Sequence, residues 1–104
     1  MPVIETGMVT HINVFSVAPD KQQALVDSLI ETVNEAKKVP GWVSASIHKS
    51  FDGFQVVNYV QFASAAAAQT VTKHLFSRGL IQRNVAIGSV APGQYEVVYT
   101  LLQD

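Results

Sequence analysis

Hydrophobic periodicity divides the first half of the chain into a strand and a helix. Residues 8–17, MVTHINVFSV, are rich in β-branched side chains and predict a first strand. Apolar positions then recur at helical spacing from Leu25 to Ala36, which predicts a long amphipathic helix. Asp20 is expected to cap this helix, and Val39-Pro40-Gly41 to end it, because proline cannot continue the hydrogen-bond ladder.

A β-hairpin is predicted next. Residues 42–50 and 54–63 read as strands, and the Asp-Gly pair in Phe51-Asp52-Gly53 favours the positive backbone angles of a tight turn. Alternation puts one set of side chains on one face of the second strand: Phe54, Val56, Asn58, Val60 and Phe62. Asn58 therefore lies among apolar neighbours, an unusual place for a side chain with two donors and an acceptor.

The last third carries weaker signals. Ser64 is expected to cap a second helix that begins with four alanines and places Val71 and Leu75 on one face. Residues 79–85 suggest a short helical turn, residues 87–93 a loop with two glycines and a proline, and residues 95–102 a final strand.

This order of elements predicts one α+β domain over residues 1–104. Strand, helix, strand, strand, helix, strand fits a ferredoxin-like βαββαβ fold, with a four-stranded antiparallel sheet and both helices on one face. The helices leave the other face of the sheet open, although it carries apolar side chains such as Val57 and Tyr59. Two sheets packed back to back in a symmetric homodimer would cover it.

Composition narrows the partners. The chain of 104 residues is 48% hydrophobic and only 14% charged, which also favours contact with another subunit. A net charge of -1 without a basic patch argues against nucleic acid. No cysteine is present, which excludes disulfides and thiolate chemistry. Neither a signal-peptide pattern nor an apolar run of membrane-spanning length occurs, so we expect a cytoplasmic protein with no membrane partner.

Four stretches together resemble a known family. They are VTHINVFSV, PDKQQALVDSL, VPGWVSASIHKSFDG and VVNYVQFAS, within residues 8–76. Their joint order resembles the antibiotic-biosynthesis monooxygenase family of dimeric α/β barrels. The resemblance implies oxygenation of an electron-rich aromatic, such as an anthrone or quinol, by O2 without flavin, haem or metal. The absence of a phosphate-binding loop, a His-x-x-x-His pair or a Gly-x-Ser-x-Gly turn agrees with this.

The resemblance also implies a site. Asn58 matches a family asparagine that points into the substrate cavity, where its N–H would stabilise oxyanion charge as a phenol or enol loses its proton. Asn13 and His11 share one face of the first strand with Phe15, and all three are expected to contact the substrate if that face adjoins Asn58. The alternative is that Asn58 only bonds a nearby backbone group or forms part of a satisfied polar network, and that Asn13 and His11 have structural roles.

Two positions depart from the family pattern. Many members carry a tryptophan four residues after the asparagine, where this chain has Phe62, so a ring remains without its N–H. Phe62 is expected to contact the substrate, and the alternative is that it only fills the core. Some relatives also place a hydroxyl or titratable group on the second helix, where this chain has alanines. His74 is the nearest substitute and lies at the edge of the helix face that looks toward the sheet. It is expected to accept the phenolic proton, and the alternative is that it is only a solvated helix edge. His48 lies on a polar strand face and is expected to be exposed.

Two other functions stay open. Haem-degrading members of the superfamily resemble this chain in an asparagine on the first strand and a histidine on the second helix, which Asn13 and His74 could supply. The second open function is non-enzymatic: a dimeric barrel that binds a small apolar ligand without catalysis.

Overall fold

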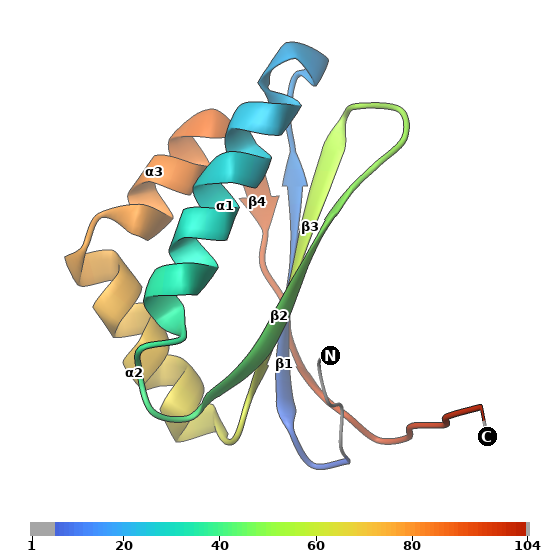
Figure 1. The fold of residues 1–104 in the computed structure, drawn as a ribbon, viewed down its shortest axis with the longest axis vertical. Helices are drawn as coiled ribbons and strands as arrows, with labels where there is room; N and C mark the ends of the chain where they lie inside the picture. The colour runs from blue at the N-terminus through green and yellow to red at the C-terminus, as the bar shows by residue number, and fades with distance from the viewer. Residues whose placement is uncertain (1–5, 104) are drawn as a thin grey trace.

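A sheet covered on one side by three helices forms the described part of the chain, residues 6–103 of a computed structural model (Figure 1). The strands are β1 (Val9–Ser16), β2 (Trp42–Lys49), β3 (Gln55–Phe62), β4 (Ser89–Ala91) and β5 (Gln94–Glu96). The helices are α1 (Gln22–Ala36), α2 (Ala65–Ser77) and α3 (Leu80–Ile87), with a 3-10 turn η1 (Pro19–Lys21) before α1.

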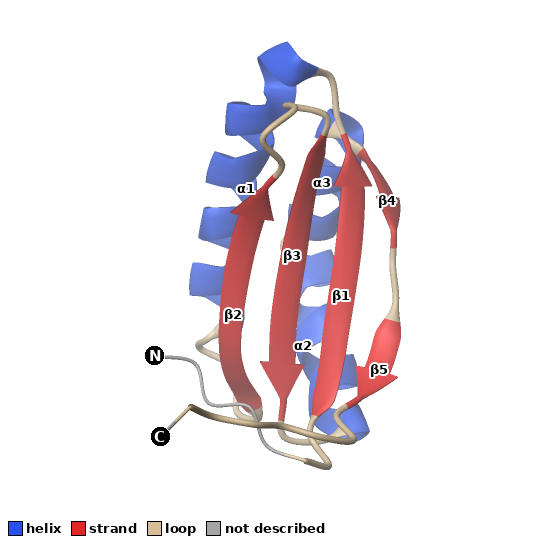
Figure 2. Ribbon diagram, turned by 90° about the vertical axis from the view of Figure 1, so that its right-hand side faces the viewer, coloured by secondary structure: helices blue, strands red, loops and turns tan. Residues whose placement is uncertain are grey.

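The sheet has the predicted ferredoxin-like topology. Its order is β2-β3-β1-β4, every neighbouring pair is antiparallel, and β5 also pairs with β1 (Figure 2). β1 and β3 pair along their full length, with Asn13 directly opposite Asn58. Directly opposed residues of an antiparallel pair project to the same face. The two asparagines therefore share one side of the sheet.

The fourth strand differs from the prediction. The segment predicted as a loop, residues 87–93, contains β4, and the strand predicted over residues 95–102 ends at Glu96. Val14 pairs with Ala91 and His11 with Gln94, so β4 and β5 keep one register along β1. They form a single edge strand interrupted at Pro92 and Gly93, because proline has no N–H to donate to the ladder.

Helix ends confirm one predicted cap and correct another. Ser64 caps α2 as expected, since its Oγ accepts a hydrogen bond from the Ala67 N–H at 3.1 Å. Asp20 does not cap α1: Pro19 begins the 3-10 turn one residue earlier, so Asp20 lies inside that turn and α1 starts at Gln22 without a side-chain cap. The short helical turn expected near residues 79–85 is present as α3.

The β2–β3 hairpin is confirmed, but only half of its Asp-Gly pair adopts a positive angle. Gly53 has a φ of 87°, whereas no non-glycine residue in the described part of the chain has a positive φ. Asp52 instead accepts hydrogen bonds through Oδ1 from Ser50 Oγ at 2.6 Å and from the Phe54 N–H at 3.0 Å. A carboxylate that receives these donors stabilises the turn.

Two groups of buried apolar side chains fill the space between the sheet and the helices. One contains Phe62, Val71 and Leu75, and the other contains Phe15, Leu25, Leu29 and Val56 among others. The opposite face of the sheet has no helix over it, and residues after β5 cross one end of that face (Figure 2). Within the described residues, no helix combines the length and apolar character needed to cross a membrane.

Candidate active site

A cavity of about 440 Å³ lies between the helix-facing side of the sheet and the three helices. Its lining is mostly apolar and includes Phe15, Val60 and Phe62 from the sheet and Leu29, Val71 and Leu75 from the helices. A mostly apolar hollow with a few polar groups is the usual form of a small-molecule site. The polar groups in the lining therefore decide what chemistry the cavity can support.

Asn58 lies in the wall of this cavity on β3. Its side chain is 7% exposed, its Oδ1 is buried, and no hydrogen bond joins its carboxamide to another described residue. The alternative that Asn58 only satisfies a nearby backbone group is not what the structure shows. Most buried polar groups in proteins are paired, so this carboxamide has hydrogen-bonding capacity left for a molecule in the cavity.

Asn13 and His11 line the same cavity from β1, beside Asn58. Nε2 of His11 is buried and has no hydrogen-bond partner among the described residues. The imidazole packs edge-on against Phe62, with ring centroids 4.8 Å apart and an interplanar angle of 61°. Desolvation by burial lowers the pKa of His11 below its usual value of 6.5, because burial disfavours the charged imidazolium.

The structure therefore brings five of the six predicted residues together. Asn58, Asn13, His11, Phe15 and Phe62 all line the cavity, and both phenylalanines are buried.

The sixth, His74, does not belong to the lining. Its Nε2 lies 2.7 Å from Oε2 of Glu35 on α1, at the junction of α1 and α2. Lys38 and Arg78 also lie near this carboxylate, at 3.0 and 3.4 Å. The hydrogen bond from His74 and then that from Lys38 lower the pKa of Glu35 to about 2. The α1–α2 packing places His74 beside Glu35, so it does not line the cavity in which it was expected to accept the phenolic proton. His48 is exposed, as predicted, with Ser46 Oγ 2.9 Å from its Nε2.

Five lining residues with polar side-chain atoms were not predicted: Trp42, Thr32, Thr72, Asn84 and Gln94. Trp42 is the direct cross-strand partner of Phe62, and its indole Nε1 is buried without a hydrogen-bond partner in the described part of the chain. The Pro-Gly-aromatic turn marked this residue in the sequence, but not its direction. Thr32 and Asn84 line the opposite wall, from α1 and α3. No sequence signal pointed to Asn84, because α3 follows a glycine in a segment without a clear apolar period.

The cavity lining contains one titratable side chain among the described residues, that of His11. No group of three or more His, Cys, Asp or Glu side chains in residues 6–103 is arranged to hold a metal ion. The arrangement thus combines neutral amide and indole donors with one neutral imidazole in an apolar hollow. Such a set can orient a flat aromatic molecule, accept one proton and stabilise a developing oxyanion.

Comparison with known proteins agrees with this geometry. Tetracenomycin-F1 monooxygenase of Streptomyces glaucescens is 50% identical over 58 residues, which are 55% of this chain and 52% of that protein. The match thus spans about half the length of this curated relative.

Solved structures share the whole fold. A monooxygenase from the gene ActVA-Orf6 of Streptomyces coelicolor, solved with the ligand nanaomycin D, has a TM-score of 0.78 and 27% identity, covering 95% of this chain and 94% of its own. SnoaB, a cofactor-independent oxygenase from Streptomyces nogalater, has a TM-score of 0.78 at 18% identity, covering 93% and 99%, which shows likeness of fold.

The family profile described as antibiotic biosynthesis monooxygenase matches residues 8–75, which include β1, α1, the hairpin and most of α2. This match carries Asn13, His11 and Asn58, the residues that line the sheet side of the cavity. The chain belongs to the antibiotic biosynthesis monooxygenase family.

Proposed function

We propose that this protein is a cofactor-independent monooxygenase that oxidises an electron-rich phenolic aromatic, of the anthrone, quinol or polyketide type, with O2. Membership of the family supports the reaction class. The similarity to a tetracenomycin-F1 monooxygenase and to a structure with bound nanaomycin D supports an aromatic substrate. The single observation that carries the proposal is the Asn58 carboxamide, which lines the cavity and makes no hydrogen bond to another described residue, so that its Nδ2 remains available as a donor.

The reaction divides into steps that the lining can assist. The substrate loses the proton of a phenol or enol, and the resulting anion transfers one electron to O2. The two radicals recombine into a peroxide, which collapses to a quinone carbonyl. One oxygen atom enters the ring, the other leaves as water together with the two hydrogens of the substrate, and the substrate supplies all the electrons. The protein needs only to bind, orient and stabilise charge.

Asn58 is assigned to the oxyanion. A carboxamide N–H donates a hydrogen bond without titrating, so it stabilises the anion at any pH at which the protein is folded. In a water-poor cavity this donor acts more strongly than it would in bulk water. Asn13, its cross-strand neighbour, would orient the same oxygen-bearing edge of the substrate.

His11 is assigned as the proton acceptor in place of His74. Its lowered pKa keeps the imidazole neutral near pH 7, and a neutral imidazole accepts a proton through its free ring nitrogen. His74 is held by Glu35 outside the lining.

Trp42 would contribute the indole N–H that position 62 lacks. Because Trp42 and Phe62 are opposed in the β2–β3 ladder, the indole enters the cavity next to the phenyl ring. The ring change at position 62 is then compatible with an intact site.

Oxygen consumption tests the proposal, with anthrones and dihydroxynaphthalenes as substrates. Asn58→Ala should lower the enzyme-dependent rate about 10²- to 10³-fold, the usual effect of removing one preorganised donor. Asn34→Ala is the matched control, since Asn34 is an exposed amide on α1 that bonds only the Ile30 carbonyl. Equal rates for Asn58→Ala and the unmodified protein would remove Asn58 from the mechanism.

Oxygen consumption and a separate hemin titration distinguish the other functions. A non-catalytic binding protein would take up these aromatics without oxygen consumption above the uncatalysed rate. A haem enzyme would show a sharp Soret shift with hemin that His74→Ala abolishes. No observation favours haem, because His74 lies outside the cavity lining.

A homodimer built on the open face of the sheet belongs to this proposal. Tyr59 and Val57 on that face are half-buried, and the C-terminal segment exposes 77% of Val98 and 87% of Leu102. Large apolar side chains at such exposure favour a partner surface.

A further inference from the structure

A second group of polar side chains faces the cavity from the helices. Asn84 on α3 and Thr32 on α1 are each 3% exposed, and both line the cavity wall across from the sheet. Their apolar surroundings in the lining include Leu29, Val33 and Ile81. The reaction outlined above uses only the sheet side, so it gives these two residues no role.

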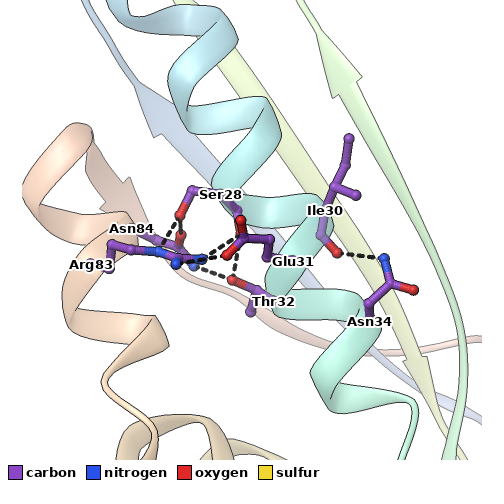
Figure 3. Close-up of polar contacts among 7 residues, drawn as sticks. All are labelled: Ser28, Ile30, Glu31, Thr32, Asn34, Arg83 and Asn84. Atoms are coloured by element: carbon purple, nitrogen blue, oxygen red, sulfur yellow. Dashed lines mark hydrogen bonds and ion pairs between the residues drawn. The ribbon is translucent and has the colours of Figure 1, made fainter.

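Hydrogen bonds connect Asn84 to Ser28, Thr32 and Arg83 in one network (Figure 3). Arg83 Nε donates to Ser28 Oγ at 2.8 Å, so the single hydroxyl hydrogen of Ser28 is free to go to Asn84 Oδ1 at 2.5 Å. Thr32 uses its own hydroxyl hydrogen on the Ser28 carbonyl at 2.8 Å. Its oxygen therefore accepts from Asn84 Nδ2 at 3.0 Å. This set of bonds fixes which end of the amide is the donor.

The network is anchored on its outer side. Arg83 also donates from Nη1 to Glu31 Oε2 at 2.8 Å and from Nη2 to the Ser28 carbonyl at 3.2 Å. A guanidinium held by three acceptors is oriented and stays charged. It polarises the Ser28 hydroxyl and, through it, the Asn84 amide.

One hydrogen-bonding position of Asn84 is left over. An amide nitrogen carries two N–H groups, and Nδ2 has one acceptor, Thr32 Oγ1, among the described residues. The packing of α3 on α1 does not need this second N–H group. Apolar side chains at a helix interface are often at least as stabilising as a buried polar network. Asn84 lines the cavity, so this remaining donor is the one that it can offer to a ligand there.

We propose that Asn84 donates a hydrogen bond to the substrate at the edge opposite the one that Asn58 binds. The substrate class is then narrowed to fused aromatics that carry a second oxygen, a carbonyl or a hydroxyl, on the far edge. This inference rests on the proposed function for the identity of the ligand, but it concerns binding and not oxygenation.

Two isomers of one compound provide the test. 1,5-Dihydroxynaphthalene has oxygens on opposite edges, whereas 1,8-dihydroxynaphthalene has both on the same edge. Binding is measured under nitrogen through the fluorescence of Trp42, the only tryptophan in the chain and part of the cavity lining. The unmodified protein should bind the 1,5 isomer about 10-fold more tightly, as one added hydrogen bond to a donor that is otherwise unpaired implies.

Asn84→Leu should reduce this preference to less than about twofold, because leucine keeps the size and removes the donor. Ser28→Ala is the second variant, since it frees the amide to rotate without altering Asn84, and it should give a smaller loss of preference. A purely structural role would weaken both isomers equally and leave their ratio unchanged. An unchanged ratio in a folded Asn84→Leu, or in Ser28→Ala if Asn84→Leu does not fold, would overturn the proposal.

The outcomes for binding and for catalysis are independent. Retained isomer preference without oxygen consumption would reject the monooxygenase and keep the role of Asn84. Oxygen consumption with no isomer preference in the unmodified protein would keep the monooxygenase and reject the role of Asn84.

Discussion

His11 illustrates how one side chain acquires a chemical role from its surroundings. On β1 it is opposed to Val60 on β3 and to Gln94 on β5, and it packs against Phe62. No carboxylate, ammonium or guanidinium belongs to the cavity lining among the described residues, so no charge there offsets desolvation. Burial alone therefore sets the direction of its pKa, downward.

This direction predicts the pH profile of the reaction. A base acts in its unprotonated form, so kcat/KM should fall in acid as His11 becomes protonated, with the midpoint of this acid limb below 6.5, the ordinary pKa of histidine. His11→Gln should remove this acid limb and lower the rate about 10²- to 10⁴-fold. His74→Ala serves as the control and should retain both the limb and the rate within about twofold. The measurement is the pH profile of oxygen consumption for the unmodified protein, His11→Gln and His74→Ala. Loss of the acid limb in His74→Ala but not in His11→Gln would reverse the assignment.

At the scale of elements, Glu35 joins the C-terminal part of α1 to α2. It accepts from His74 at 2.7 Å on α2 and lies 3.4 Å from Arg78 at the end of that helix. Arg83 and Asn84 make a second connection, from α3 to Ser28 and Thr32 of α1. The three helices that form one wall of the cavity are thus held to one another by polar contacts as well as by apolar packing.

The Glu35 contact predicts a specific acid dependence of stability. The folded state lowers the pKa of this carboxyl from 4.5 to about 2, so its stabilising effect is complete above pH 4.5 and is lost as the pH falls through about 2. Glu35→Gln should make the free energy of unfolding fall less steeply as the pH decreases from 4.5 to about 2. Urea unfolding at several pH values between 2 and 6 measures it. A variant with the same slope as the unmodified protein would show that the contact does not stabilise the fold.

At the scale of the whole molecule, the C-terminal segment lies against the open face of the sheet. A hollow of about 580 Å³ lies between them, lined by Ile12 and Tyr59 of the sheet and by residues 95–102. Gln61 on this face is fully buried, yet its Oε1 has no hydrogen-bond partner in the described part of the chain. A second subunit packed here would cover the exposed apolar side chains of the segment.

The homodimer prediction is tested by shortening the chain. The full protein should run as a dimer at micromolar concentration in light scattering coupled to gel filtration. Removal of residues 98–104 should shift it toward monomer, because the deleted part includes Val98, Tyr99, Leu101 and Leu102, each at least 73% exposed in the single chain. Val57→Lys, a charge placed on the open face, should do the same. A full-length protein that is monomeric at high concentration would refute the back-to-back packing.

Local patterns were sufficient for much of the fold because they depend on neighbouring residues. Alternation along residues 54–62 correctly placed Asn58 on the face with Val56 and Val60, and Ser64 preceded the second helix as its cap. Errors arose where a single residue competed with the pattern. Pro19 opened a 3-10 turn before the expected cap, and Pro92 with Gly93 divided the edge strand.

The sequence by itself determined the order of the elements, the face on which Asn58 lies and, through four short stretches, the family. Periodicity and turn residues express these features over a few positions. Only the tertiary structure decided which histidine enters the cavity, that Trp42 stands beside Phe62, and that Asn84 faces the cavity. Those outcomes depend on how α1, α2 and α3 pack on the sheet, and Asn84 meets Ser28 across 56 positions of sequence. Contacts at such separation are set by packing geometry, which no local pattern encodes.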